Sequence, residues 1–95
     1  MKLMCCLACG DLVVLRLEPR TCACGAARGR YLEDRSTVEQ TTGSLSIGLH
    51  NADLQAAIEA YRKTPATWRP AFCFRAYLNP LCETDVRYVA SEDTP

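Results

Sequence analysis

The chain has 95 residues, of which 48% are hydrophobic, and its 11 Lys and Arg residues balance its 11 Asp and Glu residues. This length predicts a single domain over residues 1–95, and the composition excludes an intrinsically disordered chain. A net charge of zero disfavours nucleic-acid binding, because phosphate contacts depend on an excess of Lys and Arg.

The apolar residues near the start are too few to predict a membrane span or an export signal. Residues 1–7 are followed at once by Cys9, Gly10 and Asp11, which interrupt a secretory signal before it forms. The apolar run 12–17 is far shorter than a membrane span. We therefore expect a cytoplasmic protein without membrane association, in which the seven cysteines are thiols or metal ligands rather than disulfides.

The first third of the chain predicts a β-hairpin. Residues 12–17 (LVVLRL) have strand composition, residues 18–21 reverse the chain, and residues 28–33 (RGRYLE) form the return strand with Tyr31 pointing inward. A cysteine turn is expected at each open end of this hairpin.

Two cysteine pairs, in residues 6–10 (CLACG) and 22–25 (CACG), have the spacing of metal-binding knuckles. Tetrahedral Zn²⁺ takes four soft ligands at about 2.3 Å, and two cysteines in one tight turn supply a pair of them. The glycine after each pair permits a left-handed turn that exposes backbone N–H groups to the thiolates. The pattern predicts a zinc ribbon over residues 1–35, with Zn²⁺ held by Cys6, Cys9, Cys22 and Cys24.

Alternatives remain open for both the ligands and the metal. Cys5 competes with Cys6, although only Cys6 has two residues between it and Cys9. Four sulfur ligands also suit a single iron, and unligated thiols behave as small buried hydrophobes. Cys73 and Cys82 have no neighbouring cysteine or glycine and are not expected as ligands; Cys73 is expected to face a packed surface.

The middle of the chain predicts short strands and then a helix. Leu45, Ile47 and Leu49 alternate with smaller residues, as in a strand. A helix is predicted over residues 51–63, with Asn51 as its N-cap and Thr64-Pro65 as its end. We expect one face of this helix to pack on a sheet through the apolar stripe Leu54, Ala57, Ile58 and Tyr61.

The C-terminal segment predicts two further strands. Residues 71–78 (AFCFRAYL) have the strongest strand composition, residues 79–85 turn, and residues 86–90 pair back as a last strand, while residues 91–95 are expected to fray. The predicted fold is therefore α+β: an N-terminal zinc ribbon, which is a β-hairpin with two cysteine knuckles, continuous with a small antiparallel sheet over residues 36–90 packed by one helix.

Residues 4–63 resemble a group of small, functionally uncharacterised bacterial and phage-type zinc-ribbon proteins. The shared pattern is CxxCGD, CxCG, Gly-x-Tyr and a glycine-containing segment that leads into a helix, although SIGLHN departs from its order. The resemblance implies a zinc site and this fold, but no activity. The matching residues are Cys6, Cys9, Gly10, Asp11, Cys22, Cys24, Gly25, Gly29, Tyr31, Gly43 and Asn51.

A site of four cysteines is typical of structural zinc, because catalytic zinc keeps an open position for water. His50, the single histidine, is expected to be a surface or capping residue, and GAARG lacks the lysine and serine of a phosphate-binding loop. We therefore do not expect an enzyme. The alternative is a nucleophilic Cys73 or Cys82 beside His50.

Two non-enzymatic functions compete. The first is a zinc-binding ribbon protein that acts as a small protein-interaction or regulatory module, since ribbon tips and sheet edges are docking surfaces for a protein partner. The alternative is a nucleic-acid-binding or transcription-associated zinc ribbon, which would use the cluster Arg62, Lys63, Trp68, Arg69 and Arg75 with Trp68 stacked on a base. A core-packed Trp68 is the favoured interpretation. A continuous positive stripe would support the alternative, and interleaved carboxylates would weaken it.

Overall fold

The computed structural model describes residues 1–90, so the predicted fraying of residues 91–95 lies outside the described residues. Within residues 1–90 the chain forms two four-stranded sheets and one α-helix, which confirms the α+β class. The elements are β1 (Lys2–Cys6), β2 (Leu12–Val14), β3 (Arg20–Thr21), β4 (Arg28–Tyr31), β5 (Val38–Thr41), β6 (Ser44–Leu49), α1 (Asn51–Lys63), the 3₁₀ turn η1 (Pro70–Phe72), β7 (Ala76–Leu78) and β8 (Val86–Val89).

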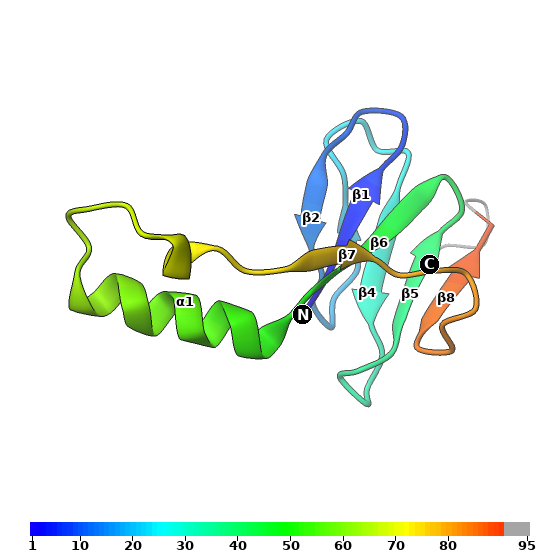
Figure 1. The fold of residues 1–95 in the computed structure, drawn as a ribbon. Coiled ribbons are helices and arrows are strands. Elements are labelled where there is room, and N and C mark those ends of the chain that lie inside the picture. Colours follow the sequence, from blue (N-terminus) through cyan, green and yellow to red (C-terminus); the bar gives the residue numbers. More distant parts are fainter. Residues whose placement is uncertain (91–95) are drawn as a thin grey trace.

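The two sheets stand together, and α1 extends away from them (Figure 1). The first sheet has the order β2-β1-β6-β7 and is antiparallel throughout. The second has the order β3-β4-β5-β8, in which β8 lies parallel to β5. The prediction of one antiparallel sheet is therefore wrong, because β8 pairs with β5 and not with the strand that precedes it.

The predicted pairing of residues 12–17 with 28–33 as the two strands of one hairpin is also wrong, although one hydrogen bond joins them, from the Tyr31 N–H to the Arg16 carbonyl at 2.7 Å. Residues 12–14 pair with β1, whereas residues 28–31 pair with β3 and β5. The physical reason is that each cysteine turn reverses the chain by itself: the N–H of Cys6 donates to the carbonyl of Asp11, and the N–H of Cys22 donates to that of Ala27. Each turn therefore closes a hairpin of its own, and the two hairpins belong to different sheets.

The core lies between the sheets. Its members come from both sheets and include one cysteine of each pair: Met4, Cys6, Val13, Leu15, Cys22, Ala27, Val38 and Val86. Gly29 lets β4 lie close to the side chains of Met4 and Leu15. A Cβ at that position would lie only 3.1 Å from the Met4 sulfur and 3.2 Å from Leu15 Cδ2. Tyr31 is half-buried against this cluster, in agreement with its predicted inward direction.

Strand β6 confirms the predicted alternation, but its buried face carries the small residues. Ser44, Ser46 and Gly48 are buried, while the intervening leucines and isoleucine are half-buried. Hydrogen bonds satisfy the serines: Gln40 Nε2 donates to Ser44 Oγ at 2.7 Å, and Asn79 Nδ2 donates to Ser46 Oγ at 3.0 Å. A buried polar group of this kind is tolerated only when it is paired.

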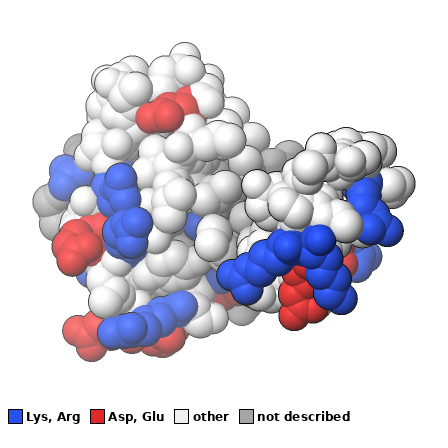
Figure 2. All heavy atoms as spheres, turned by 90° about the vertical axis from the view of Figure 1, so that its left-hand side faces the viewer, with Lys and Arg blue, Asp and Glu red and all other residues white. Residues whose placement is uncertain are grey.

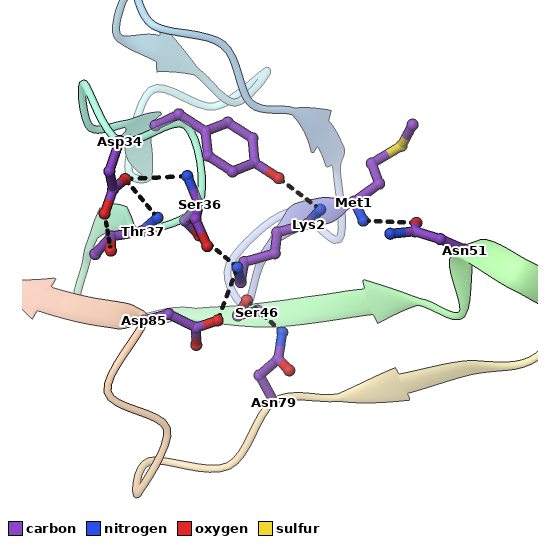
Figure 3. Close-up of polar contacts among 10 residues, drawn as sticks. Met1, Lys2, Asp34, Ser36, Thr37, Ser46, Asn51, Asn79 and Asp85 are labelled. Atoms are coloured by element: carbon purple, nitrogen blue, oxygen red, sulfur yellow. Dashed lines mark hydrogen bonds and ion pairs between the residues drawn. The ribbon is translucent and has the colours of Figure 1, made fainter.

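Hydrogen bonds and an ion pair of Lys2 join the two sheets at the start of β1 (Figure 3). Lys2 Nζ donates to the carbonyl of Ser36, in the loop after β4, and lies 3.0 Å from an Asp85 carboxylate oxygen. The backbone N–H of Lys2 donates to the Tyr31 hydroxyl at 2.8 Å. The first strand of one sheet is thereby held to three segments around the other.

The helix has its predicted bounds but not its predicted packing. His50 is the N-cap in place of Asn51, because its Nδ1 accepts the N–H of Asp53 at 3.1 Å. The apolar stripe of α1 faces η1, where Tyr61 and Phe72 meet edge to face with ring centroids 5.8 Å apart. Residues 51–75 form an arm that leaves the first sheet at β6 and returns to it at β7 (Figure 1). The expected packing of the helix on a sheet is therefore wrong.

The strand predicted over residues 71–78 is confirmed only at Ala76–Leu78. Pro70 begins η1 instead, and the N–H of Cys73 donates to the Pro70 carbonyl at 3.1 Å. Residues 70–72 form a 3₁₀ turn despite the strand composition of this segment, because the ring of Pro70 fixes its φ angle at a value that suits a helical turn.

Candidate metal centre

The structure brings together the four cysteines that the sequence predicts as ligands. The Sγ atoms of Cys6, Cys9, Cys22 and Cys24 all lie within 4.8 Å of one another. Cys6 ends β1 and Cys9 lies in the turn that follows it, while the other two come from the turn between β3 and β4. Cys6 and Cys22 are buried, whereas Cys9 and Cys24 are exposed. The cluster therefore lies where the two hairpins meet, with one side in the core and the other at the surface.

The sulfur separations suit tetrahedral coordination. Cys24 Sγ lies 3.5 Å from Cys22 Sγ and 3.7 Å from Cys6 Sγ. Four ligands at 2.3 Å from a zinc ion at the centre of a tetrahedron are separated by about 3.8 Å. The side chains present therefore fit a metal ion bound by four thiolates.

The glycine after each pair has the predicted left-handed conformation, with φ of 75° at Gly10 and 80° at Gly25. A residue with a side chain is strained at these angles, and glycine is not. The N–H of Gly10 then donates to the Cys6 carbonyl at 2.8 Å, and that of Gly25 donates to the Cys22 carbonyl at 3.1 Å. The two turns thus share one backbone design, although the second has one residue fewer between its cysteines.

Backbone N–H groups point at the sulfurs and favour the thiolate form. The N–H of Ala27 donates to Cys22 Sγ at 3.3 Å, and this bond lowers the pKa of Cys22 to about 6. N–H groups of Asp11 and Cys24 lower the pKa of Cys9 in the same way. The N–H of Ala26 also favours thiolate at Cys24, but hydrogen bonds with the Cys22 and Cys9 side chains outweigh it and raise the pKa of Cys24 to about 12. Four thiolates this close repel one another, and a bound cation would offset that repulsion.

Asp11 joins the two turns, which the sequence reasoning did not anticipate. Its Oδ2 accepts the backbone N–H of Ala23, which lies between the two cysteines of the second pair, at 2.8 Å. The place of Asp11 directly after CxxCG was the available signal, but nothing local to that turn indicates a partner twelve residues away.

The other cysteines lie elsewhere. Cys5 alternates with its neighbours along β1 and does not belong to the cluster. The cluster contains Cys6 instead, as its separation from Cys9 by two residues predicts. Cys73 and Cys82 are both exposed, and the expectation that Cys73 faces a packed surface is wrong. Within residues 1–90 no hydrogen bond joins His50 to a cysteine; its ring contacts Asp53 and Arg75.

Trp68 and the basic residues near it lie on the arm. The side chain of Trp68 is 70% exposed, so the expectation that it packs on the core is wrong. Arg75 binds Asp53 through Nε at 2.6 Å, whereas Arg62, Lys63 and Arg69 form no ion pair within residues 1–90. The predicted basic cluster therefore retains three unpaired cations.

No family model, curated protein or solved structure matches the chain. Among the helices within residues 1–90, none has the length and apolar character needed to cross a membrane.

Substitution of one buried cysteine tests the site directly. Cys22→Ser removes a sulfur from the cluster, and we expect purified protein to fall from close to one equivalent of zinc to almost none, because serine is a poor zinc ligand. Metal analysis by mass spectrometry measures zinc and iron together. Cys73→Ser and Cys82→Ser are matched controls that should retain the metal; loss of zinc in these controls with retention in Cys22→Ser would show that the site is misassigned.

A second substitution tests the link between the turns. Asp11→Asn keeps the size of the side chain but weakens the acceptor for the Ala23 N–H, and we expect zinc affinity to fall by about 10-fold or more, as for other groups that position metal ligands. Competition with a chromophoric chelator measures this affinity. Glu18→Gln, at an exposed carboxylate in the connection between β2 and β3, is the control and should leave the zinc affinity unchanged.

Proposed function

We propose that the chain is a non-enzymatic zinc-ribbon protein, of the kind that its cysteine pattern resembles, in which structural zinc supports a small protein-interaction module. The observation that carries the proposal is the group of four Sγ atoms within 4.8 Å of one another at the meeting of two hairpins. Zinc suits this site because four thiolates at tetrahedral spacing are its preferred structural ligand set.

Four cysteines complete a tetrahedral shell, so the ion would have no open position for water or substrate. Bound there, zinc would supply a cross-link between the two cysteine turns. Cys6 and Cys22 are members of the hydrophobic core that also contains Met4 and Val38. Free energy of metal binding would therefore become free energy of folding, and the role of the metal in this proposal is structural.

A protein partner is supported by the apolar surface that the fold leaves exposed. Leu12 and Val14 on the edge strand β2 are 56% and 45% exposed, and Leu78 on the edge strand β7 is 60% exposed. Tyr61 and Phe74 on the arm are 56% and 43% exposed. Leu12 and Val14 are two residues apart on β2 and face the same side of the sheet. Neighbouring exposed apolar groups of this kind are typical of an interaction surface.

Nucleic-acid binding is the second candidate, and the exposure of Trp68 among Arg62, Lys63 and Arg69 favours it. The charges elsewhere weigh against it. On the two-sheet body, Arg30 lies 3.8 Å from Glu39 and Lys2 lies 3.0 Å from Asp85. Figure 2 shows blue and red groups interleaved on the body, while the basic groups on the arm border an uncharged area. The continuous positive stripe that phosphate binding needs is not visible on this face.

Chelation tests the structural role of the metal. We expect removal of zinc to lower the melting temperature by at least about 8 °C, a shift that corresponds to about 2 kcal/mol in a domain of this size. Hydrogen exchange should lose protection in residues 5–31, which contain both cysteine turns and β4. Unchanged protection there in the metal-free protein would contradict the proposal.

Titration with nucleic acid separates the two candidate functions. We expect weak or no binding of duplex and single-stranded DNA or RNA at physiological salt, because the arm provides three unpaired cations and the body provides interleaved charges. Fluorescence anisotropy at low and physiological salt measures this. Submicromolar binding at physiological salt that is lost in Arg69→Glu would overturn the protein-partner proposal; Arg20→Glu, on the body, is the matched control.

A further inference from the structure

The arm contains an apolar groove that no other part of residues 1–90 covers. The groove has a volume of about 410 Å³ and lies between α1 and the segment 72–74. Its apolar lining consists of Leu54, Ala57, Ile58, Tyr61, Phe72 and Phe74. Arg62 is the one charged residue in the lining.

The groove is preformed, because polar contacts fix both ends of the arm. At the base, the N–H of His50 donates to the Arg75 carbonyl at 2.9 Å, and Arg75 Nε donates to Asp53 at 2.6 Å. At the far end, Arg69 Nη1 donates to Thr64 Oγ1 at 3.2 Å. A partner would therefore meet an ordered surface, which lowers the entropic cost of binding.

We propose that this groove binds an amphipathic helix of a partner protein whose polar face is acidic. The proposal rests on the proposed function and names the chemistry of the partner. Residues 54–61 of α1 rise by about 10 Å, or two turns, which matches the apolar anchors at i, i+3, i+4 and i+7 on a partner helix.

Charge complementarity specifies the acidic face. Arg62 lines the groove, and Lys63 and Arg69 lie at the same end of the arm without a carboxylate partner within residues 1–90. The arm itself has two acidic residues, Asp53 and Glu59, and Asp53 is bound to Arg75. Carboxylates on a partner would neutralise these cations, which have no ion pair in the described part of the chain, and this gives specificity and a faster association rate.

Other occupants fit these observations less well. In an antiparallel pair of arms, the cations at the tip of one copy would meet the base of the other, where Asp53 is already engaged. Strand addition to the segment 72–74 is disfavoured because the N–H groups of Phe72 and Cys73 already donate to the carbonyls of Arg69 and Pro70. Nucleic acid would leave the apolar lining without a matching surface.

The test uses the full chain purified with its metal and a fluorescein-labelled helical peptide of about 14 residues, with Leu and Phe at the anchor positions and Glu elsewhere. Anisotropy should show saturable binding. A peptide of the same composition with scrambled order, and one with Lys in place of Glu, should bind about tenfold more weakly or not at all. Equal binding of all three peptides, or none of the acidic one, would overturn the proposal.

Variants locate the binding. Phe74→Ser should weaken binding about tenfold by removing an apolar anchor, and the double variant Arg62→Glu, Lys63→Glu should weaken it and reduce its salt dependence. Leu81→Ser and Arg20→Glu, exposed residues outside the arm, are the matched controls and should bind normally. Zinc content and melting temperature confirm that each variant is folded. Unweakened binding by Phe74→Ser would rule out the groove.

Two further measurements on the same samples separate failure of this proposal from failure of the proposed function. Sedimentation should show a monomer; a dimer that Phe74→Ser dissociates would assign the groove to a second copy and overturn the helix proposal. DNA and RNA that bind at physiological salt and displace the peptide would overturn both proposals. A chain that binds neither peptide nor nucleic acid would overturn the groove proposal alone.

Discussion

The contact between the two cysteine turns is the constraint on which the rest of the structure depends. Each turn ends a hairpin of a different sheet, so the cluster of Cys6, Cys9, Cys22 and Cys24 joins the sheets at one end of β1. The Asp11 carboxylate reinforces the junction through the N–H of Ala23. At the other end of β1, Lys2 binds the loop after β4 and Asp85 before β8. A core of this small size is then held at both ends. Its interior includes polar residues such as Ser44, whose hydroxyl accepts from Gln40 Nε2 and donates to the Thr41 carbonyl.

This arrangement also explains the division between body and arm. The arm is a long excursion between two neighbouring antiparallel strands, since β6 leads into α1 and β7 pairs with β6 on the return. Its base is held by the pairing of Leu49 with Ala76 and by the polar contacts of Arg75 with His50 and Asp53. The arm therefore does not contribute its apolar stripe to the core, and the core does not stabilise the arm. The arm is stabilised by contacts between its own outgoing helix and returning segment, where Tyr61 packs against Phe72.

Local features of the sequence were predictable, and features that depend on distant partners were not. The four clustered cysteines, the left-handed Gly10 and Gly25, and the bounds of α1 follow from residues close together in the chain. The pairing of β2 with β1 and of β8 with β5 joins segments that no short-range pattern relates. The same limit applies to Asp11, whose partner lies in the second turn. Strand propensity also misplaced part of residues 71–78, where the turn at Pro70 replaces the start of the predicted strand.

The apolar stripe on α1, which packs on η1 and not on a sheet, shows why periodicity alone does not identify what a helix packs against. The spacing of Leu54, Ile58 and Tyr61 is equally consistent with a helix packed on its own sheet and one that keeps a face for another protein. Polar contacts separate the two cases here. Hydrogen bonds from Arg75 lower the pKa of Asp53 to about 2, so this carboxylate stays ionised and bonded over the whole physiological pH range. With its base fixed in this way, the arm stands clear of the sheets with its apolar groove open. A face held open by specific polar bonds, and bordered by cations that have no counter-ion within residues 1–90, has the physical character of a binding surface.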